Sequence, residues 1–323
     1  MHISVLLNES ISALNLKEDG TYVDSTLGYA GHSSEILKRI RRGYLFALDQ
    51  DNEAINYSQK KLSSISDNFE IIKTNFASIK KVLNERNVYK VDGILFDLGV
   101  SSPQLDEASR GFSYHNDAKL DMRMDQDQKL SAYDVVNTYT REQLTKIFFT
   151  YGEEKYSSSI AKNIVKYREN KPIETTMELV EIIKSSVPEK VRREKHPARK
   201  VFQAIRIEVN NELGVLEKAL NDSLDLIDVG GRIAVITFHS LEDRIVKNIF
   251  KKATDIDSKV KGLPNIPSEY LPDFRLVNTK VIEPSKEELE LNKRARSSKL
   301  RVIERIKWKV ICNEKEKSDE ETT

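Results

Sequence analysis

Short apolar runs alternate with amphipathic segments along the first hundred residues of the chain. Each run has the length of a buried strand, and each is followed by apolar residues at helical spacing. Strands that alternate with helices predict an α/β fold, with a doubly wound parallel sheet and helices on both faces. We expect strands at residues 21–23, 44–48, 69–73 and 91–97, and helices at 9–16, 51–62 and 77–86.

A long gap separates this pattern from the next buried strand, expected at 232–238 after a helix at 211–227 and a Gly230–Gly231 turn. Connections in such folds are usually about 2–6 residues besides the helix, whereas the gap after Asp97 is about a hundred residues. The intervening pattern from Ala132 to Val201 is helical. We therefore expect an all-helical insertion that closes over the edge of the sheet.

The expected organisation is a discontinuous domain, residues 1–110 and 205–312, interrupted by a connecting loop and helical domain at 111–204. Residues 313–323 are polar and are expected to be disordered. The last predicted elements are a helix at 241–253 and an antiparallel pair of strands at 275–282 and 300–308.

A tight loop with glycines at Gly28 and Gly31 follows the first strand, and Ser33 or Ser34 is expected to cap the next helix. A strand, a glycine loop and a helix bring the backbone close to a nucleotide-like ligand, where a Cβ would collide. Asp49 lies 21 residues after Gly28, at the end of the second strand. An acidic residue at that position is placed to accept hydrogen bonds from ribose hydroxyls.

Polar residues also follow the third and fourth strands, as Asn75 and Asp97. Because ligands bind at the carboxyl ends of parallel strands, these residues predict one site for a dinucleotide or S-adenosylmethionine. No second phosphate-binding signature is present, which favours S-adenosylmethionine. Asn75 and Phe76 suit the edge and face of an adenine, and Asp97 could hold the methionine ammonium. Core packing is the alternative for Phe76.

The distribution of charge along the chain indicates a polyanionic partner. The chain is 39% hydrophobic and 32% charged, with a net charge of +1. Residues 190–200 hold six cations against one anion, and residues 293–309 hold eight against one. Such patches favour a polyanion, although solvated surface faces are the alternative for each.

Cysteine and histidine usage limits other functions. The single cysteine, Cys312, excludes an internal disulfide and a cysteine-based zinc cluster. The five histidines show no close ligand spacing, so we expect no metal site. The N-terminal stretch lacks the pattern of a signal peptide, and no apolar run approaches membrane-spanning length. We expect a cytoplasmic protein without a membrane partner.

Several motifs resemble the RsmH/MraW family over nearly the whole chain, from His2 to about Trp308. They are DSTLGYAGHS from Asp24, ALDQD from Ala47, FDLGVSSPQLD from Phe96, RGFSY from Arg110, LDMRMD from Leu120, HPARKVFQAIRI from His196 and FHSLEDR from Phe238.

The resemblance implies an S-adenosylmethionine-dependent methyltransferase that acts on cytosine N4 in the decoding region of 16S rRNA in the small ribosomal subunit. It also implies a Rossmann-like class I methyltransferase sheet with an inserted helical domain. Tyr29-Ala30 stands where many relatives have further glycines, which affects only the fine geometry of the loop. The cofactor positions carried over are Ala30, Gly31, His32, Asp49, Phe76, Asp97 and Gln104.

The chemistry requires alignment rather than a metal, because the methyl carbon of a sulfonium is already electrophilic. Cytosine N4 is a poor nucleophile, so the enzyme must position it and accept hydrogen bonds from its N–H groups. The loop Ser101-Ser102-Pro103 loosely resembles the polar-Pro-Pro-aromatic motif of amino-methyltransferases. We assign these three residues to orienting N4, with a structural proline turn as the alternative.

The RNA-binding residues are expected in the basic patches, beside aromatic side chains such as Phe112 and Tyr114 that could stack a base. A structural role is the alternative for His239. The sequence leaves open whether the chain forms a homodimer. The assigned RNA-binding residues are Arg110, Lys195, Arg199, His239, Arg294, Arg296 and Lys299.

Two other readings of the whole chain remain open at this point. One is an NAD-dependent dehydrogenase on the same sheet, and another is a catalytically silent RNA-binding factor that keeps the cofactor pocket. A methyltransferase acting on a small molecule or a protein is a further alternative.

Overall fold

A seven-stranded sheet forms the centre of the computed structural model, which describes residues 4–308 apart from 101–106, 195, 257–259, 261 and 263. The strand order is β3-β2-β1-β4-β5-β7-β6. The strands β1 to β5 are parallel, and β7 is antiparallel to both neighbours. The bounds are β1 (Thr21–Asp24), β2 (Tyr44–Asp49), β3 (Phe69–Lys73), β4 (Val91–Asp97), β5 (Ile227–Thr237), β6 (Phe274–Leu276) and β7 (Lys299–Arg305).

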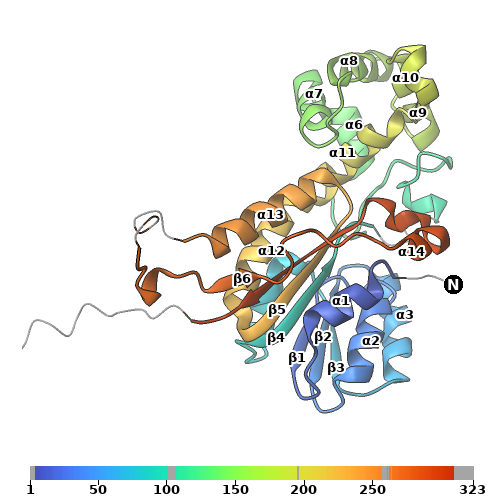
Figure 1. The fold of residues 1–323 in the computed structure, drawn as a ribbon. Helices are drawn as coiled ribbons and strands as arrows, with labels where there is room; N and C mark the ends of the chain where they lie inside the picture. Colours follow the sequence, from blue (N-terminus) through green and yellow to red (C-terminus); the bar gives the residue numbers. More distant parts are fainter. Residues whose placement is uncertain are drawn as a thin grey trace, which may run out of the picture.

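Two helical layers cover the sheet, because alternate residues along each strand face opposite sides. Leu45 and Ala47 of β2 pack in the core formed with the first layer, and Phe46 and Leu48 pack in the core formed with the second. This arrangement confirms the predicted doubly wound α/β fold (Figure 1). The first layer holds α1 (Leu7–Leu14), α2 (Gly31–Arg39) and α3 (Asn52–Ser63), and the second holds α4 (Ile79–Asn84), α12 (Glu212–Leu226) and α13 (Ser240–Thr254).

Strand β5 differs from its prediction at the amino end. It begins at Ile227 and not after the glycines, so the expected Gly230–Gly231 turn is wrong. The register with β4 jumps from Val91↔Ile227 to Gly93↔Arg232, and the extra residues form an irregularity inside the strand. Gly230 has φ +80° there, which glycine adopts without a Cβ penalty.

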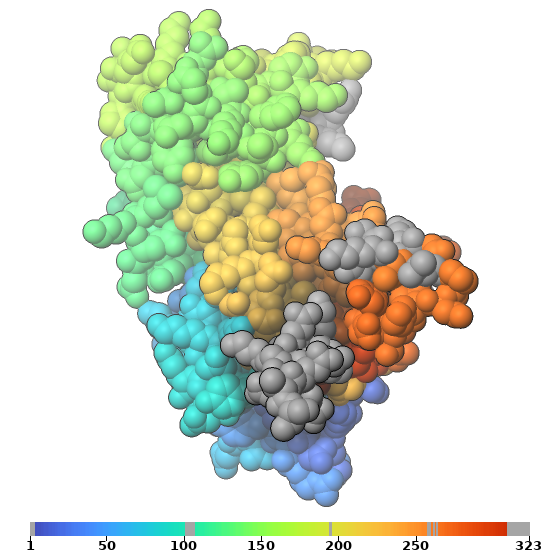
Figure 2. Space-filling model, turned by 90° about the vertical axis from the view of Figure 1, so that its left-hand side faces the viewer, coloured from blue at the N-terminus to red at the C-terminus, as the bar shows by residue number. Residues whose placement is uncertain are grey.

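The predicted helical insertion is present as a unit with its own hydrophobic core (Figure 1). The hydroxyls of Ser131, Thr140 and Thr175 form capping boxes that start three of its helices. In Figure 2 this unit and the first half of the sheet domain lie at opposite ends of the molecule. Its helices are α6 (Ala132–Thr138), α7 (Arg141–Thr150), α8 (Ser157–Arg168), α9 (Thr176–Ser185), α10 (Glu189–Glu194) and α11 (Ala198–Asn210).

Helix α11 joins the helical unit to the sheet domain. It crosses the expected boundary at residue 204, and Ile205 and Val209 still pack in the core of the helical unit. Only Asn211, in a left-handed conformation with φ 47°, separates α11 from α12. The two helices therefore form a nearly continuous connection between the two hydrophobic cores.

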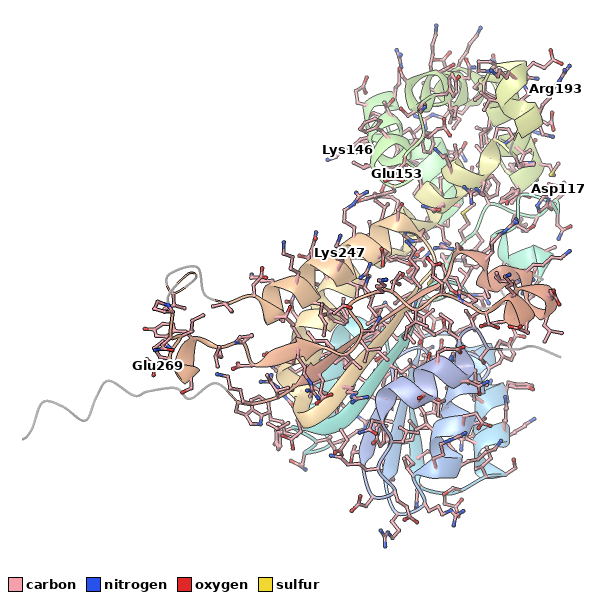
Figure 3. All side chains as sticks on the ribbon, viewed as in Figure 1. Asp117, Lys146, Glu153, Arg193, Lys247 and Glu269 are labelled. Atoms are coloured by element: carbon pink, nitrogen blue, oxygen red, sulfur yellow. The ribbon has the colours of Figure 1, made fainter. Side chains whose placement is uncertain are left out.

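A second connection runs from Glu153, which lies at the lower end of the helical unit toward α13 (Figure 3). Its carboxylate accepts hydrogen bonds from Ser240 Oγ at 3.0 Å and from Arg244 Nη2 at 3.1 Å. Both donors lie in the first turns of α13, so this ion pair ties the unit to the sheet domain. Within the described residues, no helix has both the length and the apolar character needed to cross a bilayer.

Candidate active site

A cavity of about 360 Å³ opens at the carboxyl edge of the sheet. Residues at the ends of β1, β2, β3, β4 and β5 contribute to its wall, as the sequence predicted for the first four strands. The N-terminal segment adds Ser4 and Val5, the helical unit adds Arg206, and the 3₁₀-helix η4 (Lys293–Ser297) adds Arg294. The sheet edge and the helical unit therefore enclose one site together.

The glycine loop between β1 and α2 is held without a side-chain cap. Helix α2 begins at Gly31 and its N-cap is Ala30, which has φ 55°. The expectation that Ser33 or Ser34 caps this helix is wrong, because both serines lie inside its first turn and point back. The hydroxyl of Ser33 donates to Asp24 Oδ2 at 2.6 Å, and that of Ser34 donates to the carbonyl of Ala30.

Two positions in this loop depend on special backbone conditions. A Cβ at Gly31 would lie 1.7 Å from Ser4 Oγ, so glycine allows the N-terminal segment to approach. Ala30 adopts a left-handed conformation that costs an alanine about 1–2 kcal/mol. Ala30 is fully buried and does not belong to the cavity lining, so its predicted role at the cofactor stays a prediction.

Asp49 fastens the glycine loop to the end of β2. Its carboxylate accepts hydrogen bonds from the backbone N–H of Gly28 at 2.8 Å and of Asp51 at 2.9 Å. Burial raises the pKa of Asp49 to about 6, against the opposing effect of these hydrogen bonds. Each carboxylate oxygen has a second lone pair, so the predicted ribose contact remains open to it.

Asp97 lies at the end of β4 beside His32. Asp97 Oδ2 is 3.6 Å from His32 Nδ1, and His32 Nε2 lies 3.1 Å from the carbonyl of Val5. Asp97 Oδ1 is buried and has no hydrogen-bond partner among the described residues. Burial raises the pKa of Asp97 well above its usual value, and the nearby Asp24 and Glu242 carboxylates raise it further. A cation placed against this oxygen would relieve both effects.

The segment after β3 places the aromatic ring of Phe76 and the amide of Asn75 in the cavity wall. Phe76 packs edge-on against Phe96 at 5.6 Å, as the core-packing alternative expects. It also lines the cavity, and its contact with a ligand stays a prediction. The amide of Asn75 caps the 3₁₀-helix η1 (Phe76–Ser78) through Ala77 N–H and donates to Gln50. Among the predicted cofactor residues, Gly31, His32, Asp49, Phe76 and Asp97 line the cavity, whereas Gln104 is outside the described residues.

Arg110 contradicts its assignment to an RNA-binding surface. It is only 4% exposed, and its Nη1 pairs with Asp51 at 2.9 Å. Its Nη2 donates to the carbonyls of Arg123 and Met124. Phe112 is likewise buried in the core of the helical unit and cannot stack on a base from solvent. The guanidinium instead holds the connecting segment to Asp51, the N-cap of α3.

The remaining predicted RNA-binding residues have different surroundings. Arg199, Arg294 and Arg296 are exposed, and Arg294 also lines the cavity. Lys299 is half-buried, with its Nζ 3.8 Å from Asp243. Lys195 and the predicted catalytic residues Ser101, Ser102 and Pro103 are outside the described residues.

His239 has the local partners that its structural alternative required. It is the N-cap of α13, where its Nδ1 accepts from the backbone N–H of Glu242. Its Nε2 lies 3.0 Å from Glu242 Oε1. Tyr114 is half-buried and stacks on His196 at 4.6 Å, beside the exposed His115.

Arg206 is the main cavity residue that the sequence interpretation left without a role. It lies in the HPARKVFQAIRI motif, more than a hundred residues after the ends of β1 to β4 that line the same cavity. Its i+6 partner Glu212 follows the break at Asn211, so helical periodicity alone would not pair them. The presence of a cation inside a motif of the resembled family was the available signal.

The strand order and the cavity at the carboxyl edge define a doubly wound, Rossmann-like α/β fold. Residues 1–306 match the model of the MraW methylase family, and the chain belongs to that family. This membership argues against the dehydrogenase alternative.

Two relatives carry the name "Ribosomal RNA small subunit methyltransferase H". The one from Lactiplantibacillus plantarum is 55% identical over 310 residues, which is 95% of this chain and 97% of the relative. The one from Exiguobacterium sibiricum is 54% identical over 307 residues, covering 95% and 98%. A solved rRNA methylase from Streptococcus thermophilus covers 95% of this chain and 100% of its own, with TM-score 0.44 and 11% identity.

Replacing Arg110 by methionine leaves the Asp51 carboxylate buried without this cation. We expect the free energy of unfolding, measured in urea, to fall by about 3–5 kcal/mol. The exposed Arg199 provides a control, because Arg199→Met should change this energy by less than about 0.5 kcal/mol. Equally small effects of both substitutions would contradict a structural role for the Arg110–Asp51 pair.

Proposed function

We propose that this protein transfers a methyl group from S-adenosylmethionine to N4 of a cytosine in 16S rRNA of the small ribosomal subunit. The observation that carries the proposal is the cavity at the edge of the sheet, where Asp97 Oδ1 is buried with no hydrogen-bond partner among the described residues. The relatives named as small subunit rRNA methyltransferases, which match nearly the full chain at over half identity, support the RNA substrate.

The residues around the cavity fit the parts of this cofactor. The absence of a side chain at Gly31 lets Ser4 approach, so that both residues line the cavity. Asp49 would accept from the ribose hydroxyls, and Phe76 would pack against the adenine. Asp97 would hold the ammonium group, since its buried oxygen requires a positive partner.

The reaction is a direct displacement. The lone pair of N4 would form a bond to the methyl carbon of bound S-adenosylmethionine while the carbon–sulfur bond breaks, and the electron pair of the broken bond would remain on sulfur. The methylated nitrogen then loses a proton to solvent. A sulfonium supplies an electrophilic carbon, so the protein's part is to align the two groups. We assign Ser101, Ser102 and Pro103 to orienting N4, since they directly follow Val100 in the sequence and Val100 lines the cavity.

The RNA would approach across the helical unit and the segment around η4. We assign residues 111–204 to substrate recognition, within a methyltransferase domain formed by 1–110 and 205–312. Extrusion of the target base from the rRNA would bring it to the cavity. The proposed RNA-contacting residues are Lys195, Arg199, His239, Arg294, Arg296 and Lys299.

The direct test uses small subunits purified from a strain that lacks this protein. Incubation with labelled S-adenosylmethionine should place one labelled methyl group on 16S rRNA, and nucleoside mapping should identify N4-methylcytidine. Subunits from the parent strain provide the control, because their site is already methylated. Label in protein, in a small molecule or in another nucleoside would contradict the proposal, as would cofactor binding without transfer.

The affinity for S-adenosylhomocysteine should depend on pH through Asp97. Only the ionised carboxylate attracts the ammonium, and its pKa is raised in the free protein. Affinity should therefore rise with pH as Asp97 loses its proton. Asp97→Asn should weaken binding of S-adenosylhomocysteine by about ten- to a hundredfold at pH 8, because a hydrogen bond to a charged group is lost. It should also flatten the rise of affinity with pH.

Isothermal titration calorimetry between pH 5 and pH 8 measures both effects. Asp92 is the matched control, because it lies in the same strand but pairs with Lys17 at 2.7 Å. Asp92→Asn should leave affinity and pH slope within twofold of the parent protein. An unchanged pH slope in Asp97→Asn would show that another group carries the dependence.

Charge reversal on the exposed surface should weaken RNA binding selectively. Arg296→Glu should lower affinity for small subunits and reduce the slope of log K against log salt by about 1. Arg42→Glu reverses an exposed cation near Glu18 and should change neither quantity. Filter binding at several salt concentrations measures the slope. Equal slopes for the two variants would show that Arg296 does not contact the RNA.

A further inference from the structure

Arg206 brings a positive charge from the helical unit into the cavity. Its side chain is 17% exposed and its partner Glu212 is 10% exposed. Nε and Nη2 donate to the two oxygens of Glu212 at 2.8 and 2.9 Å. Because Glu212 is the first residue of α12 and Arg206 lies in α11, this bidentate pair spans the break at Asn211. The guanidinium is therefore fixed in orientation by the joint between the two helices.

A second carboxylate keeps this guanidinium charged. One carboxylate oxygen of Glu212, one of Glu242 and one ring nitrogen of His239 lie within 4.8 Å of one another. Burial opposes the charged form of Arg206, but Glu212 and then Glu242 outweigh it and raise the pKa of Arg206. A permanently charged guanidinium is a hydrogen-bond donor only and cannot accept the proton that leaves N4. Any role at the cavity is therefore recognition or positioning.

One edge of the guanidinium remains available. The bonds to Glu212 occupy Nε and one hydrogen of Nη2, whereas Nη1 has no hydrogen-bond partner among the described residues. A planar guanidinium presents Nη1 and the second Nη2 hydrogen as two parallel donors. Such an edge matches two adjacent acceptors on a planar ligand.

We propose that Arg206 recognises the target base by donating to N3 and O2 of cytosine. This inference rests on the proposed function and specifies the base-binding part of the same site. Cytosine carries two acceptors side by side at N3 and O2, next to the N4 amine that reacts. Uracil carries an N–H at position 3, which would face the guanidinium donor against donor. Arg206 thus distinguishes the two pyrimidines and sets N4 beside the cofactor.

The remaining walls of the cavity suit a flat base. Met124 and Phe238 line it together with Arg206 and provide apolar surface for the faces of the ring. Asp97 and Arg206 line the same cavity with opposite charges, so the ammonium group and the base edge have separate partners. The carboxylate of the cofactor is the other anion that Arg206 could bind, and the experiment must separate the two.

The experiment compares cytidine and uridine binding to the protein saturated with S-adenosylhomocysteine, by calorimetry at millimolar nucleoside. In the parent protein, cytidine should bind at least about fivefold more tightly than uridine, as expected for one bidentate contact to a base. The Arg206→Gln/Glu212→Gln double variant removes both buried charges and keeps an amide pair, which protects folding. It should bind both nucleosides equally and bind S-adenosylhomocysteine within twofold of the parent.

Arg39→Gln is the matched control, because Arg39 is an exposed arginine paired with Glu35 on α2. It should keep the full preference for cytidine. A preference that survives in the double variant, or that is absent from the parent protein, overturns the inference.

Loss of S-adenosylhomocysteine affinity with an unchanged nucleoside ratio would assign Arg206 to the cofactor's carboxylate and also overturn the inference. Failure of the parent protein to bind S-adenosylhomocysteine at all would instead overturn the proposed function.

Discussion

The site depends on the electrostatic cost of gathering carboxylates at one end of a buried sheet. Asp24, Asp49 and Asp97 end three adjacent strands, and Asp24 is almost fully buried. Hydrogen bonds from Ser33, Thr26 and the glycine loop satisfy the first two carboxylates. Asp97 keeps one oxygen without a partner among the described residues. A cation placed against this oxygen would supply the partner that the described residues do not.

The position of the site could be predicted because the carboxyl ends of parallel strands lie at the same edge of a sheet. Apolar runs located β1 to β4, and the residue after each run had to reach the same edge. The prediction of the start of α2 from local sequence was wrong, because a tertiary contact determines where this helix begins. Helix α2 starts two residues before Ser33 and three before Ser34, the two predicted caps, since Gly31 packs against Ser4 and a left-handed Ala30 precedes the helix.

Charge in a sequence does not reveal burial, and this explains the errors at arginines. Arg110 was assigned to the RNA surface by its sign, but its three acceptors lie on segments brought together only by folding. Arg206 was left without a role for the same reason, because Glu212 lies beyond a helix break. Family resemblance located the motifs around both residues and did not specify what each side chain contacts.

The α11–α12 connection joins the two parts of the molecule that form the wall of the cavity. The cavity wall comes from the strand ends on one side and from the helical unit on the other, with Asn211 as the only residue between the two helices. A ligand that touches both walls would span the joint between α11 and α12, and its contacts would then connect the helical unit with the sheet domain.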